Sequence, residues 1–264
     1  MTIPSTSGSL VVALGEYDTR WHDPKASLSS AREIAHRARS AGADLLVLPE
    51  MCTTGFTMEA DEFAEPVDGA SAQAFRRLAA DEKLWIVAGL SMRKEGQFVN
   101  SALAFSPDGS IAASYDKQRL FGFASETSVY SAGNKACIVS VGGVALGLFV
   151  CFDLRFPELF REVAPEVDGL IVIANWPAAR QQHWEILTQA RAIENQCYLI
   201  GVNRIGEGGG LSYEGGSVIL DPWGERIDTP AGSAGVRTAR ISHRAVVEVR
   251  NKFPLGLSRT NRPD

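Results

Sequence analysis

The stretch VALGLFVCFDLRFPE, residues 144–158, decides how this chain folds. Residues 144–150 form a continuous apolar run of strand length, which predicts a strand buried on both faces. Cys151 ends that strand, and residues 157–163 are predicted to form a short helix. Another buried strand, residues 170–174, follows the helix. The order strand, helix, strand indicates an α/β protein.

The N-terminal half of the chain repeats this order. Residues 10–14 and 45–48 are apolar strand candidates on either side of a helical stretch, residues 24–41. The helix starts at Asp23-Pro24, a capping residue followed by a proline suited to the first turn, and stops at Gly42. These residues therefore predict a βαβ unit.

Further elements extend both halves in the same way, each ending in a strand and a hairpin. The first half adds a helix over 70–81, a strand over 84–90 and a hairpin of 100–105 with 110–115; the second adds a helix over 178–196, a strand over 197–202, a flexible glycine loop over 206–210 and a hairpin of 217–220 with 226–228. We therefore predict a four-layer αββα sandwich of two pseudo-repeated mixed β-sheets, with helices outside.

Composition limits the class of protein. The 264 residues are 45% hydrophobic and 22% charged, and no linker divides them, so one globular domain over 1–264 is expected. The formal charge of -5, without a basic run, disfavours nucleic acid as a partner. Neither a secretory signal nor a membrane-length apolar segment is present, so we expect no membrane contact and a cytoplasmic location.

Cysteine and histidine spacing argues against a metal site. Neither the four cysteines nor the four histidines form a ligand motif such as CxxC or HExxH, so no metal and no cofactor are expected. The thiols are expected to be reduced. The C-terminal tail, residues 243–264, begins as a helix and ends in an apolar segment that suits either a contact with its own domain or a subunit interface. We favour the interface and expect a homodimer or higher homo-oligomer.

Three polar residues follow predicted strands: Glu50 ends LLVLPE, Lys117 follows SYD, and Cys151 ends VALGLFV. In α/β proteins the ligand binds beyond the carboxyl ends of the strands, which makes these residues catalytic candidates. Each alone has another explanation, because a strand-end glutamate is often solvated and a buried cysteine is often simple packing.

The three segments together resemble the carbon-nitrogen hydrolase, or nitrilase, superfamily. LLVLPEMCTTGF, YDKQRLF and CFDLRFPELFRE are similar to its three signature segments, in order and spacing. The resemblance continues through ANWPAARQQHWEILTQARAIENQ and GGSVILDPWGE, and so covers nearly the whole chain. It implies an amide-cleaving enzyme that needs no cofactor.

The resemblance implies a role for each of four residues. Glu50 would be the general base, Lys117 the stabiliser of the tetrahedral intermediate, Cys151 the nucleophile, and Glu126 the residue that orients the lysine. The chemistry agrees, because a thiol with a pKa of roughly 8.5 needs a base to become the attacking thiolate. A surface carboxylate on a loop is the alternative reading of Glu126.

Substrate contacts are expected from Arg155, Phe152, Phe121 and Trp176. By the resemblance Arg155 would bind a substrate carboxylate, and the alternative is an ion pair with Asp153, Glu158 or Glu162. The whole-chain pattern is most similar to the ω-amidase-like branch, which acts on small amides such as 2-oxoglutaramate; an N-carbamoyl amino acid hydrolase is the alternative. Gly122 departs from the side chain that we expect there in this branch.

Two further readings belong to other classes. The chain could be a catalytically silent scaffold, which the joint presence of Glu50, Lys117 and Cys151 opposes. It could also be a Cys-His thiol enzyme with His183 as its base, although the sequence around His183 is typical of an amphipathic core helix.

Overall fold

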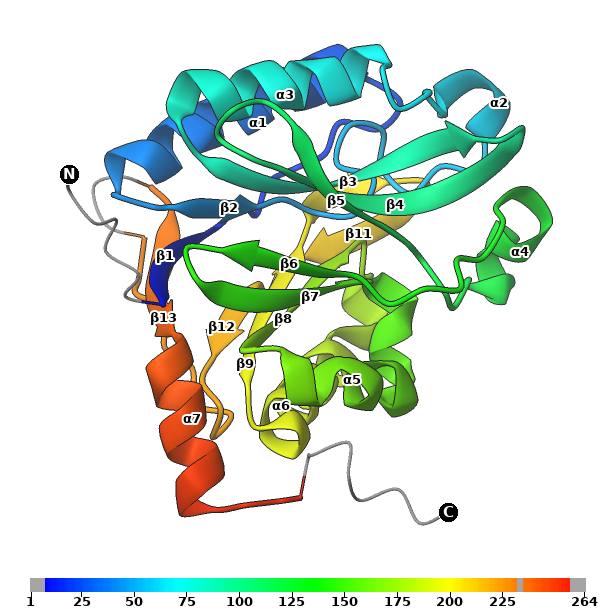
Figure 1. Ribbon diagram of the computed structural model, residues 1–264. Helices are drawn as coiled ribbons and strands as arrows, with labels where there is room; N and C mark the ends of the chain where they lie inside the picture. The colour runs from blue at the N-terminus through cyan, green and yellow to red at the C-terminus, as the bar shows by residue number, and fades with distance from the viewer. Residues whose placement is uncertain (1–7, 232–234, 257–264) are drawn as a thin grey trace.

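A computed structural model describes residues 8–231 and 235–256 of the chain. Two β-sheets pack face to face in it, and helices cover the outer side of each sheet (Figure 1). The predicted four-layer αββα sandwich is confirmed. The helices over the first sheet are α1 (Pro24–Ser40) and α3 (Ala70–Glu82), and those over the second are α5 (Pro157–Val163) and α6 (Gln181–Asn195).

Within the described ranges, six strands form the first sheet; in spatial order they are β13 (Arg237–Ser242), β1 (Ser9–Leu14), β2 (Leu45–Val47), β3 (Trp85–Lys94), β4 (Gln97–Phe105) and β5 (Ile111–Asp116). The strands β1, β2 and β3 run parallel, and the outer strands pair antiparallel to their neighbours. The parallel centre places the ends of β1 and β2 at one edge of the sandwich.

The described part of the second sheet has five strands; in spatial order they are β12 (Val218–Leu220), β9 (Tyr198–Asn203), β8 (Gly169–Ala174), β7 (Val144–Val150) and β6 (Ile138–Val141). Here too the three central strands, β7, β8 and β9, are parallel, and both flanking strands are antiparallel. The two halves of the chain therefore repeat one arrangement, as their sequence patterns predict.

The parts of the fold that the sequence does not predict are mainly edge strands. β6 and β13 lie at sheet edges, and only every second residue of β6 is buried. Such alternation gives a weaker apolar signal than the continuous runs of the buried central strands. β3 is also longer than predicted, and it turns at Glu95-Gly96 directly into β4.

Two predictions in the second half are wrong. The glycine-rich stretch 206–210 is not a loop: β10 (Ile205–Gly208) and β11 (Leu211–Glu214) pair as an antiparallel hairpin. Its two-residue turn, Gly209-Gly210, has positive φ at both positions, which glycine adopts without strain. The expected hairpin strand 226–228 is reduced to an isolated bridge between Leu220 and Arg226.

The core has two main layers of apolar side chains. One lies between the sheets and continues to α5 and α6, where the rings of Phe149 and Phe160 stack at 4.0 Å. The other lies between the first sheet and its helices, with Phe75 of α3 against Phe105 of β4. Both layers hold the strand ends rigidly, as a site built on those ends requires.

Three further α-helices belong to the described chain: α2 (Ala60–Phe63), α4 (Glu126–Val129) and α7 (His243–Lys252). α7 confirms the helix predicted at the start of the tail. The rest of the predicted tail from 257 to 264 lies outside the described residues, and its place at a subunit interface stays a prediction. No helix in the described ranges has the length and apolar character needed to cross a membrane.

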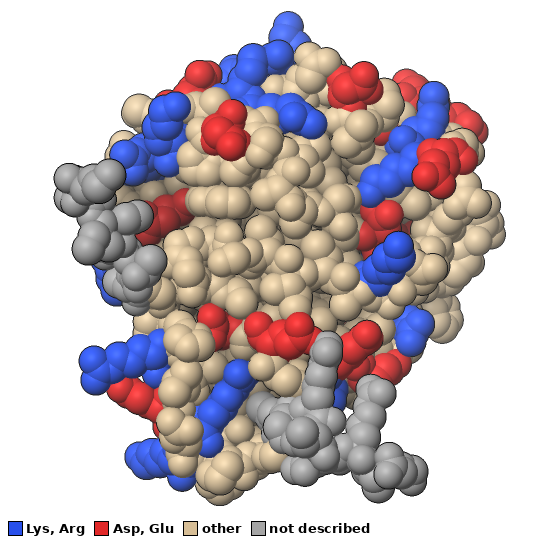
Figure 2. Space-filling model, in the orientation of Figure 1, with Lys and Arg blue, Asp and Glu red and all other residues tan. Residues whose placement is uncertain are grey.

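Charged side chains of both signs surround a broad area without charge on the face seen in Figure 2. In the same view of Figure 1, the strands β5 and β6 lie behind this area. Ile138 of β6 is among the exposed large apolar residues of the chain.

Arg250 attaches α7 to the C-terminal end of α6 and to the segment that precedes β8. Its guanidinium donates to the carbonyl oxygens of Ala164 at 2.8 Å, Val167 at 3.0 Å, Gln196 at 3.2 Å and Asn195 at 3.4 Å. Two of these carbonyls close the C-terminal end of α6, where a cation is favourable.

We predict that Arg250→Ala lowers the free energy of unfolding by about 2 kcal/mol, because a charged donor to several carbonyls is lost. Urea denaturation followed by circular dichroism measures this. Arg244→Ala is the matched control on the same helix, since Arg244 is exposed and pairs with the exposed Glu248 at 2.6 Å. Equal effects of the two substitutions would contradict the proposed anchoring role of Arg250.

Candidate active site

The strand ends bring the predicted catalytic side chains together. Glu50 lies just beyond β2, Lys117 directly follows β5, and Cys151 directly follows β7, so both sheets contribute to one site. Gly89 of β3 makes room for Glu50, because a Cβ atom there would lie 2.5 Å from the Glu50 Cα atom. The site therefore depends on a close approach of two backbone segments at Gly89.

Lys117 lies between two carboxylates. Its Nζ donates to Glu50 Oε1 at 3.1 Å, and to Glu126 Oε1 and Oε2 at 3.0 and 2.9 Å. The side chains of all three residues are fully buried. The surface-loop reading of Glu126 is thus wrong, since this residue begins α4 with its carboxylate turned inward, where it also accepts from the Phe121 amide at 2.5 Å.

Two asparagines, neither of them predicted, hold Glu50. The Asn175 backbone amide donates to Glu50 Oε2 at 2.7 Å, and its side-chain amide donates to the Glu50 carbonyl oxygen at 2.5 Å. Asn100 Nδ2 donates to Glu50 Oε1 at 2.7 Å. The only trace of them in the sequence is a polar residue in the strand FVNSALAF and another at the end of IVIAN.

The charges of the site follow from these contacts. Burial alone would lower the pKa of Lys117, but the carboxylates of Glu50 and Glu126 outweigh it and raise that pKa, so the ammonium stays charged. Burial and the nearby Glu50 carboxylate raise the pKa of the Cys151 thiol. The thiol therefore stays protonated at neutral pH until a base accepts its proton.

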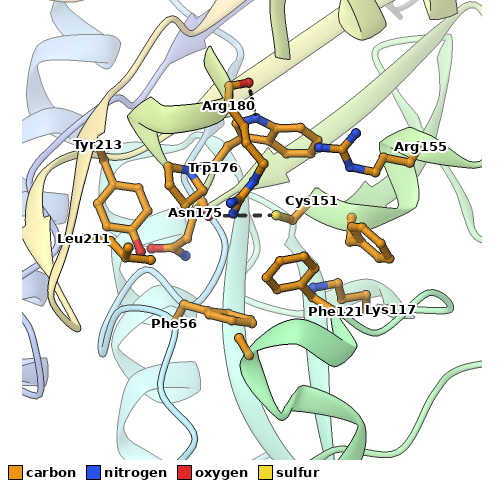
Figure 3. A pocket seen from close by; sticks show the side chains of 13 residues that line it. Phe56, Lys117, Phe121, Cys151, Arg155, Asn175, Trp176, Arg180, Leu211 and Tyr213 are labelled. Atoms are coloured by element: carbon orange, nitrogen blue, oxygen red, sulfur yellow. Dashed lines mark hydrogen bonds between the residues drawn. The ribbon is translucent and has the colours of Figure 1, made fainter. Parts of the chain in front are cut away.

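Cys151 occupies a sharp turn between β7 and a short 3₁₀ helix, η2 (Cys151–Arg155). Its φ of 47° is left-handed, a strained conformation for a cysteine, and its side chain lines a pocket at this edge of the sandwich. Its Sγ atom lies 3.9 Å from the Asn175 carbonyl oxygen (Figure 3). Strain of this kind persists where the surrounding structure over-determines it.

Asp153 supplies much of that surrounding structure. Its buried carboxylate accepts from the Val150 amide at 3.0 Å, the Tyr115 hydroxyl at 2.8 Å and the Arg119 amide at 2.8 Å. Burial raises the pKa of Asp153 to about 6, although these donors favour its charged form. The residue joins the segment that carries Lys117 to the segment that carries Cys151.

A pocket opens above Cys151, and Figure 3 shows its lining. All four predicted substrate-binding residues, Phe121, Phe152, Arg155 and Trp176, line it, as do Lys117 and Cys151. Sequence reasoning missed its other side chains, which come from loops and from the β10–β11 hairpin; these are Phe56, Ala124, Asn175, Pro177, Arg180, Leu211 and Tyr213.

Two guanidinium groups reach this pocket. Arg155 lies over the Trp176 ring at 4.8 Å, and Arg180 lies over the Phe121 ring at 5.2 Å. Neither has a carboxylate partner among the described residues. Of the ion-pair partners considered for Arg155, Glu158 pairs with Arg119 at 3.3 Å. Burial and the neighbouring Arg180 charge lower the pKa of Arg155.

The structure places His183 with the arginine rather than with the thiol. Its Nδ1 lies 3.1 Å from an Arg155 guanidinium nitrogen, and it does not line the pocket with Cys151. This arrangement opposes the Cys-His reading. Among the residues that the structure describes, no three His, Cys, Asp or Glu side chains converge as metal ligands would.

Comparison with known proteins assigns the family. The model of the carbon-nitrogen hydrolase family matches residues 11–251. The omega-amidase YafV of Escherichia coli (strain K12) is 40% identical over 221 residues, which cover 81% of this chain and 83% of that protein. The 2-oxoglutaramate amidase of Bacillus subtilis (strain 168) is 34% identical over 244 residues, 91% of this chain and 93% of that protein.

A solved structure agrees with these relatives. XC1258 from Xanthomonas campestris, a CN-hydrolase superfamily protein with an arsenic adduct in its active site, is 35% identical with a TM-score of 0.86, and the match covers 93% of this chain and 95% of that one. These similarities confirm the resemblance to the ω-amidase-like branch and oppose a silent scaffold. The chain belongs to the carbon-nitrogen hydrolase family and is an amide-hydrolysing enzyme.

Proposed function

We propose that this enzyme is an ω-amidase, which cleaves the terminal amide of a dicarboxylic keto acid such as 2-oxoglutaramate and releases ammonia. One observation carries the proposal: the pocket that holds Cys151 also holds Arg155 and Arg180, both without a carboxylate partner in the described chain. A substrate with an amide at one end and a carboxylate at the other suits such a pocket. The similarity to an omega-amidase and to a 2-oxoglutaramate amidase supports it.

Acylation begins with a proton transfer from Cys151 to Glu50. The resulting thiolate attacks the amide carbon and forms a carbon-sulfur bond, while the carbonyl oxygen becomes negative. The Lys117 ammonium and the backbone amide of Phe152, in the first turn of η2, stabilise that oxygen. Glu50 then gives its proton to the amide nitrogen, the carbon-nitrogen bond breaks, and ammonia leaves a thioester on Cys151.

Deacylation uses the same residues, with water in place of the thiol as the proton donor to Glu50. Glu50 accepts a proton from water, and the hydroxide attacks the thioester carbon, again with Lys117 facing the negative oxygen. The carbon-sulfur bond breaks, the acid product leaves, and Cys151 recovers its proton. Glu126 contributes by holding Lys117, since both of its oxygens accept from the ammonium.

The aromatic walls of the pocket favour a short, planar substrate. Phe121 and Phe152 meet edge to face at 5.1 Å, and Trp176 is fixed because its indole nitrogen donates to the Arg180 carbonyl oxygen at 2.8 Å. These contacts pre-organise the walls before substrate binds. They also keep Arg180 close to the ring that faces Arg155.

We predict that the purified enzyme releases ammonia from 2-oxoglutaramate, and that Cys151→Ala reduces this release to background because no other group can form the thioester. An ammonia assay over ω-amides and N-carbamoyl amino acids measures both. Cys137→Ala is the matched control, since Cys137 is half-buried outside the pocket.

Two results would reject the proposal. Undiminished activity of Cys151→Ala would show that Cys151 is not the nucleophile. A preference for N-carbamoyl amino acids would show that these compounds, and not ω-amides, are the substrate class.

The arginine pair predicts a charge-dependent effect on KM. Arg155→Lys and Arg180→Lys should each raise KM for 2-oxoglutaramate about 10- to 100-fold, because a bidentate charged contact is lost. The KM for pentanamide, a neutral amide of the same chain length, should change little. Steady-state kinetics on both substrates test this, with Arg119→Lys as the control because its guanidinium is exposed and pairs with Glu158. An equal rise for both substrates would contradict a carboxylate-binding role.

We also propose that two copies associate and that the enzyme acts in the cytoplasm, as the sequence predicts. Phe253 and Leu255, which follow α7, are exposed large apolar residues. Size-exclusion chromatography with light scattering should give twice the mass of one chain, and Phe253→Ser with Leu255→Ser should shift the equilibrium toward the monomer. A monomer at all concentrations would reject the dimer.

A further inference from the structure

One buried side chain that the proposed mechanism does not use touches both carboxylates of the site. Asn100 lies within β4, is fully buried, and donates from a single Nδ2 atom to Glu50 Oε1 at 2.7 Å and to Glu126 Oε1 at 2.9 Å. A primary amide has two N–H groups, so each carboxylate receives one of them.

The backbone of Asn100 also holds the third member of the cluster. The Lys117 amide donates to the Asn100 carbonyl oxygen at 2.9 Å. Asn100 pairs with Ser91 in the register of β3 and β4, and β5 lies on the other side of β4, so its position is fixed from both neighbours. Asn100 is therefore a rigid point of contact for Glu50, Lys117 and Glu126 together.

The charges explain why such a contact is needed. Two carboxylates share one ammonium and all three side chains are fully buried, so negative charge exceeds positive charge within this cluster. Like charges at this separation favour protonation of one carboxylate, whereas hydrogen bonds to the charged form oppose it. The Asn100 amide supplies two such hydrogen bonds without adding a charge.

The other end of the same side chain shows that the amide is kept for its donors. Asn100 Oδ1 is buried and has no hydrogen-bond partner in the described part of the protein. An unpaired buried acceptor costs stability, and an apolar side chain would avoid that cost. Rotating the amide would only bring Oδ1 against two carboxylate oxygens, so the observed orientation is forced.

We propose that Asn100 is a positioning residue, whose side-chain amide keeps Glu50 and Glu126 side by side as carboxylates against the single ammonium of Lys117. The inference rests on the proposed function, in which Glu50 must be a carboxylate to accept the Cys151 proton. Without the amide, the acid form of the pair is favoured, and the fraction of enzyme with a competent base falls at a given pH. The acid limb of the pH profile then moves to higher pH.

Other titratable groups face this cluster, and their effects on the pH profile must be distinguished from those of Glu50 and Glu126. The charged and titratable neighbours are Lys117, Cys151, Tyr130, Asp153 and Tyr213. Tyr130 and Tyr213 have pKa values raised by burial, to about 12, far from the acid limb. Asp153, with a pKa raised by burial to about 6, lies within the range of that limb. An Asp153→Asn variant therefore belongs to the experiment.

The test compares pH profiles of Asn100→Leu, Asn100→Ser and the wild type. We expect Asn100→Leu to lower kcat about 10- to 100-fold with little change in KM, and to move the acid limb up by about one pH unit. Asn100→Ser keeps one donor and should give an intermediate shift. Asn195→Leu is the matched control, because Asn195 is also buried with an unpaired Oδ1 but lies on α6, bonded to the Arg191 carbonyl oxygen.

A second measurement does not depend on the substrate. The rate of Cys151 alkylation by iodoacetamide, followed by mass spectrometry of its peptide, reports proton removal by Glu50 at each pH. If the acid limb of the pH dependence of Cys151 alkylation moves to higher pH in Asn100→Leu, the inference is supported even if none of the amides assayed is cleaved. An alkylation limb at the wild-type position in both Asn100 variants would overturn it, as would an acid limb that disappears in Asp153→Asn.

Discussion

The ion pairs of one buried ammonium constrain this structure more than any other interaction. Lys117 has no contact with solvent, and its charge is tolerated only because Glu50 and Glu126 face it. Buried ion pairs contribute little net stability compared with apolar packing, because desolvation offsets their attraction. The cluster is thus better explained by chemistry than by folding, and the sandwich supplies the rigid strand ends that hold it.

The site divides its chemistry between charged and apolar parts of one pocket. The thiol and its proton acceptor lie at the buried end. There, fixed protein groups rather than water stabilise a developing charge. The guanidinium groups of Arg155 and Arg180 lie among aromatic rings, which hold them without neutralising them. An anionic substrate group would then be the missing partner.

The sequence predicts the elements that are buried on both faces and misses those at the margins. Continuous apolar runs mark β7 and β8, whereas the short edge strands β6 and β13 alternate or carry charge. Glu50, Lys117 and Cys151 stand at strand ends and within recognisable motifs, and the structure places them around one pocket; their roles stay predictions. Asn100 and Arg180 belong to no such pattern, because only the packing of β4 and of the 3₁₀ turn η4 (Ala178–Arg180) directs them to the site.

The pairing of β13 with β1 gives the chain a particular order of assembly. Ser9 of β1 lies opposite Ser242 of β13. The outer edge of β1, one of the first strands to be synthesised, is therefore covered only after β13, one of the last, has been made. Closing so long a loop is slow, and an open strand edge is a template for association with other chains. While the ribosome is still making the C-terminal segment, the nascent protein already contains the cysteine turn and both carboxylates but exposes β1, which makes that interval the natural point for a chaperone to act.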